Sequence, residues 1–156
     1  MSHISTVKLT LTDPDAIDAA ARACGLRYVR DQQTYRTFGG RTEACDGALV
    51  LAGSDRAYEI GLVRVRTNPD GSRVPDPAGR EFEIRYDAWN RGGGMMDAVG
   101  PECRKLLQEY GIAKTQRIAA ARGMAFRRET LPDGSVRCYC TPTTKKWATA
   151  GAGRGW

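Results

Sequence analysis

Residues 4–25 read ISTVKLTLTDPDAIDAAARACG. The first eight alternate between apolar and polar side chains, as a half-buried strand does, and the apolar side carries Val7, Leu9 and Leu11. Asp13 and Pro14 then favour a helix start, because aspartate caps free backbone amides and proline fits the first helical position. The helix has an apolar stripe that ends before Gly25 and comprises Ile17, Ala20, Ala21 and Cys24. The stretch therefore predicts a strand, a turn and a short helix.

Strand-like segments follow this unit. Residues 26–30 and 34–38 have the length and composition of short strands, and residues 47–52 form an apolar run suited to a strand covered on both faces. Within residues 57–66, one face is expected to carry Tyr58, Ile60 and Leu62. The same alternation recurs at Phe82, Ile84 and Tyr86. Residues 68–79 are dense in Pro, Gly and Asp and predict an exposed loop between strands.

The last third predicts helix followed by a β-hairpin. Pro101 begins the main helical region, Gly111 is expected to interrupt it, and Gly123 is expected to end it. Asp133-Gly134 separates two strand-like runs, which is a strong hairpin signal, and these runs are 124–129 and 136–141.

A weak internal repeat relates residues 19–30 to residues 117–128. Each contains an alanine-rich helix, a glycine stop at Gly25 or Gly123, and a strand. Two βαββ-like halves packed on one another would explain the repeat, and chance similarity of alanine-rich helices is the alternative. We predict an α+β fold, a mainly antiparallel sheet with two or three short helices. Residues 1–147 would form one domain, and 148–156 a flexible Gly/Ala-rich tail.

The composition is typical of a globular protein. The chain has 156 residues, of which 41% are hydrophobic and 27% charged, as expected for one domain with one core. No apolar run approaches the ~18 residues of a membrane helix, and the start of the chain lacks the pattern of a secretory signal. We predict a cytoplasmic location and no membrane partner.

Five cysteines and one histidine, His3, restrict the chemistry. The cysteines are odd in number and form no CxxC pair, so they do not indicate a disulfide framework. The close pair Cys138 and Cys140 is expected to point to one face as core-facing small hydrophobes, with a metal or redox role as the alternative. A Cys-His zinc site and a histidine-based triad are both hard to assemble. We expect no metal site and no cofactor.

Two further features are candidate sites. Arg91-Gly92-Gly93-Gly94 matches neither the P-loop nor the dinucleotide fingerprint, and we interpret it as a flexible connector, with phosphate binding as the alternative. Asp87, between Tyr86 and Trp89, would act in acid-base chemistry if it lay in an apolar pocket. The structural alternative for Asp87 is to anchor the end of a strand.

Positive charge is concentrated toward the C-terminus. Residues 101–156 carry 11 Lys and Arg against 4 Asp and Glu, whereas residues 1–100 carry 13 against 14. A basic surface attracts polyanions through salt-sensitive steering. The candidate contacts for a partner or nucleic acid are Lys114, Arg117, Arg122, Arg127, Arg128, Arg137, Lys145, Lys146 and Trp147. A solvated helix face with a solubilising tail is the alternative.

Several short motifs occur in a characteristic order along residues 1–140. They are Met1-Ser2-His3, Tyr58-Glu59-Ile60-Gly61, Tyr86-Asp87-Ala88-Trp89, Gln108-x-Tyr110 and Pro132-Asp133-Gly134. In this order and spacing the chain resembles the conserved hypothetical chloroplast reading frame thirty-five family, a domain of unknown function in plastids, cyanobacteria and bacteriophages. The resemblance implies a compact α+β domain and supplies no catalytic residues.

The chain departs from that family's pattern. The family often has two tryptophans after the aspartate, where this sequence has Asp87-Ala88-Trp89, and the glycine-rich stretch and the tail at 148–156 look peculiar to this chain. The resemblance, together with these differences and the basic C-terminal part, suggests a form of that family encoded by a phage or a mobile element.

Three classes of function follow from these features. A small non-enzymatic adaptor or inhibitor needs only a basic patch that fits an acidic protein surface or a nucleoprotein complex, such as a host defence complex, and we favour it because it requires no missing motif. Direct nucleic-acid binding would use the basic residues for phosphates and stack bases on Tyr139, Phe126 or Trp147, but the sequence shows no helix-turn-helix, RNP or zinc-finger pattern. An enzyme would depend on Asp87.

Overall fold

The computed structural model describes residues 4–54 and 56–143. The fold is α+β and mainly antiparallel, as predicted. One six-stranded sheet has the order β1-β8-β6-β5-β2, with β7 added beside β6. Its strands are β1 (Ile4–Leu11), β2 (Leu26–Val29), β5 (Ala48–Leu51), β6 (Ile60–Thr67), β7 (Arg73–Pro75) and β8 (Glu81–Asp87). Two small two-stranded sheets are formed by β3 (Thr34–Arg36) with β4 (Thr42–Ala44), and by β9 (Met124–Thr130) with β10 (Val136–Pro142).

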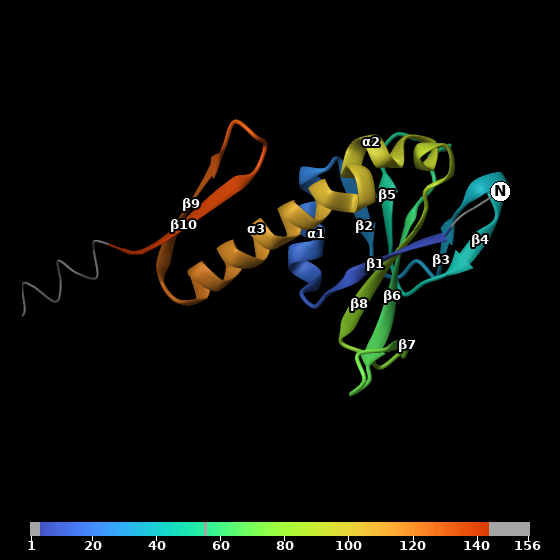
Figure 1. The fold of residues 1–156 in the computed structure, drawn as a ribbon, viewed down its shortest axis with the longest axis horizontal. Coiled ribbons are helices and arrows are strands. Elements are labelled where there is room, and N and C mark those ends of the chain that lie inside the picture. The colour runs from blue at the N-terminus through green and yellow to red at the C-terminus, as the bar shows by residue number, and fades with distance from the viewer. Residues whose placement is uncertain (1–3, 55, 144–156) are drawn as a thin grey trace, which may run out of the picture.

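Within residues 4–54 and 56–143, three α-helices accompany the strands. They are α1 (Pro14–Ala23), α2 (Met95–Val99) and α3 (Arg104–Ala121). Figure 1 shows α1 and α3 side by side next to the six-stranded sheet, with β9 and β10 along the far part of α3. Short 3₁₀ segments lie at Phe38–Gly40, Trp89–Gly94 and Pro101–Cys103. Within the described residues, no helix is long and apolar enough to cross a membrane.

The predicted strand-turn-helix at the start of the chain is confirmed. Asp13 Oδ1 accepts hydrogen bonds from the backbone N–H groups of Asp15, at 3.0 Å, and Ala16, at 3.2 Å. These bonds satisfy amides that the first helical turn leaves free. The stripe from Ile17 to Cys24 is buried, and Gly25 has a φ of 75°, which glycine adopts without steric cost.

Leu9 does not follow the predicted alternation. Thr6 lies opposite Arg85 and Thr10 opposite Glu83, so four residues of β1 span only two residues of β8. Such an irregularity redirects side chains. Leu11 is buried as expected, whereas the Leu9 residue is 53% exposed.

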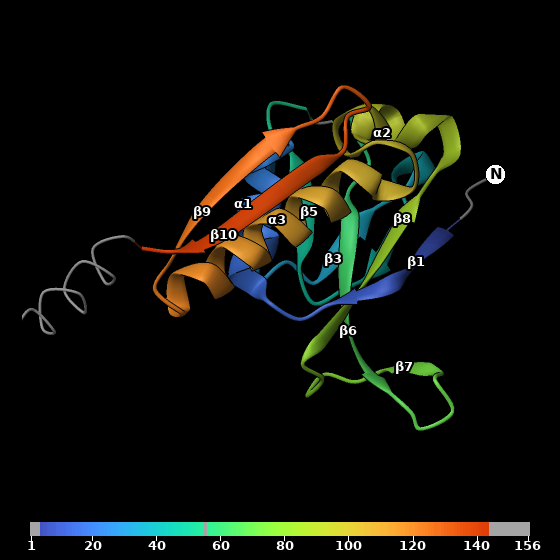
Figure 2. The ribbon, with the colours of Figure 1, turned by 60° about the vertical axis from the view of Figure 1, so that its left-hand side comes forward.

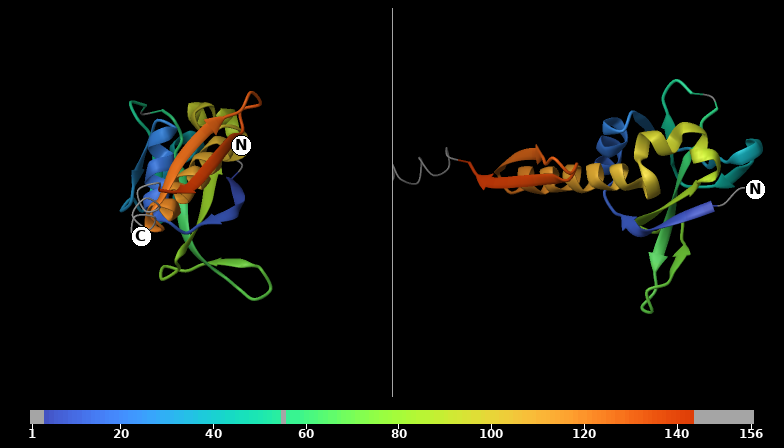
Figure 3. Two further views of the ribbon diagram at one scale, coloured as in Figure 1. Left: turned by 90° about the vertical axis from the view of Figure 1, so that its left-hand side faces the viewer. Right: turned by 45° about the horizontal axis from the view of Figure 1, so that its top comes forward.

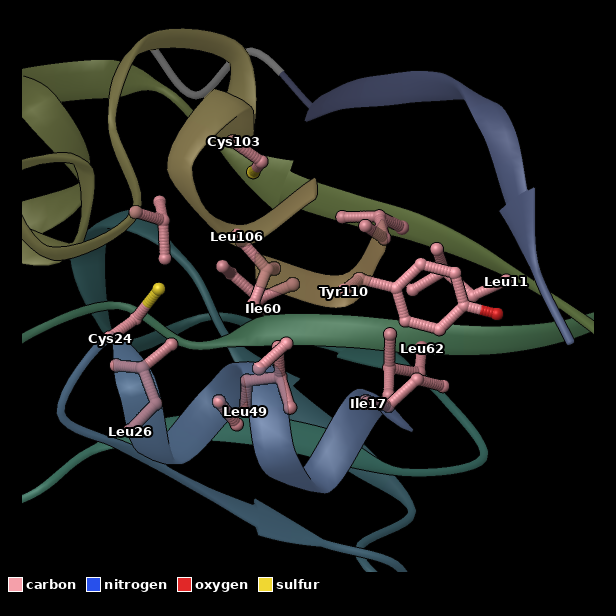
Figure 4. Close-up of a cluster of buried hydrophobic side chains, with 14 of the residues drawn as sticks. Leu11, Ile17, Cys24, Leu26, Leu49, Ile60, Leu62, Cys103, Leu106 and Tyr110 are labelled. Carbon is pink, nitrogen blue, oxygen red and sulfur yellow. The ribbon is translucent and has the colours of Figure 1, made fainter. Parts of the chain in front are cut away.

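The main core lies between the sheet and the two long helices. Figure 4 shows the side chains of Ile60, Leu62 and Leu49 facing Ile17 of α1 and Leu106 of α3. The hydroxyl of Tyr110 on α3 accepts hydrogen bonds from the backbone N–H groups of Thr12, at 2.9 Å, and Asp13, at 3.2 Å. The core and this hydroxyl together fix α3 against the start of α1.

A smaller core lies on the opposite face of the sheet. It contains Tyr35, Cys45, Ala48, Val63 and Val65, and the β3–β4 hairpin contributes the Tyr35 ring. That ring packs directly on Gly61 of β6, where an added Cβ would lie 2.3 Å from Tyr35 Cδ1. Glycine at this position therefore allows the hairpin to approach the sheet closely.

The predicted interruption of the helix at Gly111 is wrong. α3 continues from Arg104 to Ala121, and both Tyr110 and Ile112, on either side of the glycine, are buried. A mid-helix glycine costs only about 1 kcal/mol relative to alanine, which the packing of its neighbours outweighs.

The predicted C-terminal hairpin is confirmed, with β9 and β10 antiparallel around Asp133-Gly134. Gly123 after α3 and Gly25 after α1 both have a positive φ, of 66° and 75°, so the repeat holds for the local conformation of the backbone. The correspondence ends there, because β2 joins the six-stranded sheet while β9, among the described strands, pairs only with β10. Figure 3 shows this hairpin and the end of α3 projecting from the sheet.

The turn-rich segment 68–79 is largely exposed, as predicted, and also contains the short strand β7. Residues 144–156 lie outside the described part of the chain. The predicted tail at 148–156 and the candidate contacts Lys145, Lys146 and Trp147 therefore have no structural account.

Candidate functional site

Lys114 and Arg117 on α3 contact the start of α1. The Lys114 Nζ donates to Thr12 Oγ1 at 2.8 Å and lies 5.9 Å from the centre of the Tyr110 ring. Arg117 forms ion pairs with Asp13 at 2.8 Å and with Asp15 at 3.2 Å. Burial alone would raise the pKa of Asp13, but hydrogen bonds from Arg117 and from two backbone amides lower it overall. Both basic residues therefore have internal partners.

Arg128 on β9 also has an internal partner. Its two terminal nitrogens donate to the two carboxylate oxygens of Glu109 on α3, each at 3.1 Å. The hydrogen bond to Glu109 raises the pKa of the Arg128 guanidinium. This paired contact orients one face of the hairpin toward α3. Phe126, two residues earlier on the same strand, shares that face and is half-buried, so it is poorly placed for the predicted base stacking.

The opposite face of the hairpin carries Arg127, Tyr139 and Arg137. Arg127 and Tyr139 lie directly opposite each other in the β9–β10 register. The Arg127 guanidinium lies 4.2 Å from the centre of the Tyr139 ring, a cation–π contact. The Tyr139 hydroxyl donates to Glu129 at 2.8 Å and accepts from Arg137 at 3.3 Å. One aromatic side chain therefore positions two exposed guanidinium groups.

Arg127 and Arg137 differ in one respect from Arg117 and Arg128. Among the described residues, neither Arg127 nor Arg137 forms an ion pair with a carboxylate. Arg122, exposed at the end of α3, likewise has no ion pair with a described residue. We call Arg127, Arg137 and Tyr139 the outer basic face. Within the described residues, Arg122, Arg127 and Arg137 are the candidate arginines whose positive charge is not already paired with a carboxylate.

Asp87 is held as a structural anchor. It is 1% exposed, and its carboxylate accepts hydrogen bonds from the backbone N–H groups of Phe38, at 3.0 Å, and Trp89, at 2.9 Å. The rings of Phe38 and Trp89 meet edge to face with centroids 6.0 Å apart. The carboxylate thus fixes two loops at the end of β8, which matches the structural alternative for this residue.

The glycine-rich segment forms an ordered turn. Asn90, Arg91, Gly92 and Gly93 have φ values of 50° to 64°, and the Gly92 carbonyl accepts a hydrogen bond from the N–H of Tyr58 at 3.0 Å. An added Cβ on Gly93 would lie 3.1 Å from the Arg56 carbonyl oxygen. The segment is therefore packed on residues 56–58, which differs from the flexible connector that we predicted.

The cysteines do not form a site in the described chain. Cys24, Cys45 and Cys103 are buried, and burial raises the pKa of each thiol, for Cys103 to about 12. Neutral thiols are weak nucleophiles and weak metal ligands. Cys138 is half-buried and Cys140 exposed, so the predicted core-facing position is wrong for Cys140. No group of three potential metal-ligating side chains occurs among the described residues.

Comparisons with protein-family models, with curated proteins and with solved structures gave no match to this chain. The resemblance to the chloroplast reading frame family stays a prediction that rests on its short motifs.

The partners of the basic residues were missed by sequence reasoning. Asp13 lies 104 positions before Arg117, and Glu109 lies 19 positions before Arg128. No spacing rule connects such pairs. The opposition of Arg127 and Tyr139 was missed as well. A two-residue turn at Asp133-Gly134 would set Arg127 opposite Cys140, whereas in the structure the Leu131 N–H donates to the Ser135 carbonyl at 2.8 Å, and this longer loop sets Arg127 opposite Tyr139.

Proposed function

We propose that this protein is a small non-enzymatic adaptor or inhibitor that binds an acidic surface of a larger protein or nucleoprotein complex through the outer basic face. The supporting observation is that Tyr139 holds Arg127 and Arg137 together, while Arg117 and Arg128 are ion-paired internally. Pre-positioned guanidinium groups lose little freedom when they bind carboxylates or phosphates. Arg and Tyr are also enriched among residues that dominate binding energy.

The experiment is an affinity capture of tagged full-length protein from lysate of the cells in which it occurs, with and without nuclease. The variant Arg127→Glu/Arg137→Glu is expected to reduce recovery of a nuclease-resistant partner at least tenfold, since each arginine would contribute about 1–2 kcal/mol. The control Arg27→Glu/Arg66→Glu changes net charge equally at two exposed strand arginines and should leave recovery within twofold. Equal losses in both variants would contradict the proposal.

Direct nucleic-acid binding is the second candidate, and the Arg127–Tyr139 stack beside Arg137 favours it. If Arg122, Arg127 and Arg137 contact phosphates, the affinity for a labelled 20-nucleotide single-stranded DNA should fall as salt is added. A plot of the logarithm of the binding constant against the logarithm of the salt concentration should have a slope of about −2. Arg127→Ala/Arg137→Ala removes two of the three contacts and should reduce the magnitude of that slope by about 1.4. A slope near zero in fluorescence anisotropy would exclude this candidate.

A further inference from the structure

β1 is one edge of the six-stranded sheet, and among the described strands it pairs only with β8. Figure 2 shows β1 at the edge of the sheet, apart from the β9–β10 hairpin. On an edge strand, backbone N–H and C=O groups on the outer side have no strand partner. β1 also carries two of the five exposed large apolar residues in the described chain, Ile4 at 41% and Leu9 at 53%.

A groove of about 590 Å³ lies between β1 and the first turns of α3. Its apolar lining comes from Val7 and Leu9 of β1 and Leu107 of α3, and Glu102 and Arg104 line it from the segment that starts α3. The irregularity between Thr6 and Thr10 is what frees Leu9 from β8 pairing. The groove is thus a trough beside an unpaired strand edge, and its lining combines aliphatic side chains with polar ones.

A second cavity of about 410 Å³ shares Ser5, Tyr86 and Glu102 with the groove. Burial raises the pKa of the Tyr86 phenol, nearby Cys103 adds to this effect, and a hydrogen bond with Ser5 opposes it. The phenol is therefore neutral at physiological pH. Glu102 has a φ of 54°, a conformation that costs a non-glycine residue about 1–2 kcal/mol, and this backbone directs its exposed side chain to both cavities.

We propose that this groove binds an extended segment of a partner protein, which adds a strand to the free edge of β1 and places aliphatic side chains against Val7, Leu9 and Leu107. An extended backbone is the ligand that satisfies a row of strand N–H and C=O groups. Alternate side chains of an added strand point to the same face, so residues i and i+2 of the segment both enter the trough. Glu102 and Arg104 are exposed and only loosely paired, at 3.4 Å. They present one negative and one positive charge to polar groups at the end of the bound segment.

A second copy of this chain fits the edge less well. In a two-fold symmetric antiparallel pair, one residue lies opposite its own copy, so the numbers of opposed residues add to an even total. Ile4 and Leu9 add to an odd number and cannot face each other. Pairing centred on Thr6 sets Ile4 opposite Lys8, and pairing centred on Val7 sets it opposite Thr10. Pairing centred on Lys8 sets Leu9 opposite Val7 but Ile4 opposite Thr12. No symmetric register of β1 therefore gives both Ile4 and Leu9 an apolar partner.

The test uses the full chain and a display library of random 12-residue peptides, with counter-selection on Leu9→Lys. Enriched peptides are synthesised and their affinities measured by fluorescence anisotropy. We expect peptides with aliphatic residues two positions apart, binding at least tenfold more weakly to Leu9→Lys and to Leu107→Ala. The control Ile118→Lys adds the same charge at another exposed apolar residue, on α3, and should change affinity less than twofold.

N-methylation of single peptide amides tests the added strand without altering the protein. A single methylation should weaken binding at least tenfold when it falls on one set of alternate amides. A single methylation on any of the intervening amides should weaken binding less than threefold. The proposal is overturned by losses without this period-two pattern, by the absence of peptides that discriminate against Leu9→Lys, or by a concentration-dependent dimer that Leu9→Lys abolishes. Arg127→Glu/Arg137→Glu should leave peptide affinity unchanged, so the failure of either proposal is recognised separately.

Discussion

Replacing Gly61 by alanine is expected to lower the free energy of unfolding by about 3 kcal/mol or more, and the melting temperature by about 10 °C. The added Cβ would lie 2.3, 2.6 and 2.8 Å from three atoms of the Tyr35 ring. Tyr35 is 1% exposed and rigidly packed, so the ring cannot move aside without displacing the β3–β4 hairpin. Urea unfolding followed by circular dichroism measures the change.

Gly111→Ala is the matched control for this prediction. No atom lies within 4 Å of an added Cβ at Gly111, and the residue is exposed on a continuous helix. Alanine should therefore stabilise the protein by about 0.5–1 kcal/mol.

A double-mutant cycle isolates the contact with the ring. In a Tyr35→Ala background, Gly61→Ala should cost under about 1 kcal/mol, because the ring that it meets is gone. An unchanged cost in that background would show that the clash with Tyr35 is not the cause.

Asp87→Ala is expected to destabilise the protein by about 3 kcal/mol or more, because hydrogen bonds to a charged acceptor contribute about 1.5–3 kcal/mol each. The change leaves the backbone N–H groups of Phe38 and Trp89 without their carboxylate acceptor. It should also loosen the Phe38–Trp89 ring contact, which near-ultraviolet circular dichroism detects. Urea unfolding gives the free energy.

Asp76→Ala is the control for the anchoring role of Asp87. Asp76 Oδ1 accepts from the N–H of Ala78 at 2.9 Å in the exposed turn-rich segment, the same local geometry as Asp87 with Trp89. Asp76→Ala should lower the free energy of unfolding by less than about 1 kcal/mol. A fully stable Asp87→Ala protein would contradict the anchoring role and would revive the hypothesis of a catalytic carboxylate.

Local patterns predicted much of the secondary structure correctly. The Asp13 cap, the buried side of β8 and the Asp133-Gly134 hairpin depend on residues within a few positions of one another, so a short window contains the forces that act. The predictions for Gly111 and Leu9 failed for a different reason. Packing of Tyr110 and Ile112 overrides the low helix propensity of glycine, and pairing with β8 sets the register of β1.

The sequence by itself determined most of the longer elements of this protein, their approximate limits and the excess of positive charge in its last third, because propensity, periodicity and composition are properties of the chain. It did not predict β4, β7 or α2. The tertiary structure decided which charges are free. Arg117 and Arg128 meet carboxylates far away in sequence, whereas Arg127 and Arg137 meet Tyr139 across a hairpin. It also decided that β1 is an edge with a groove beside it. Both outcomes depend on contacts between distant segments, which form only when the whole core packs.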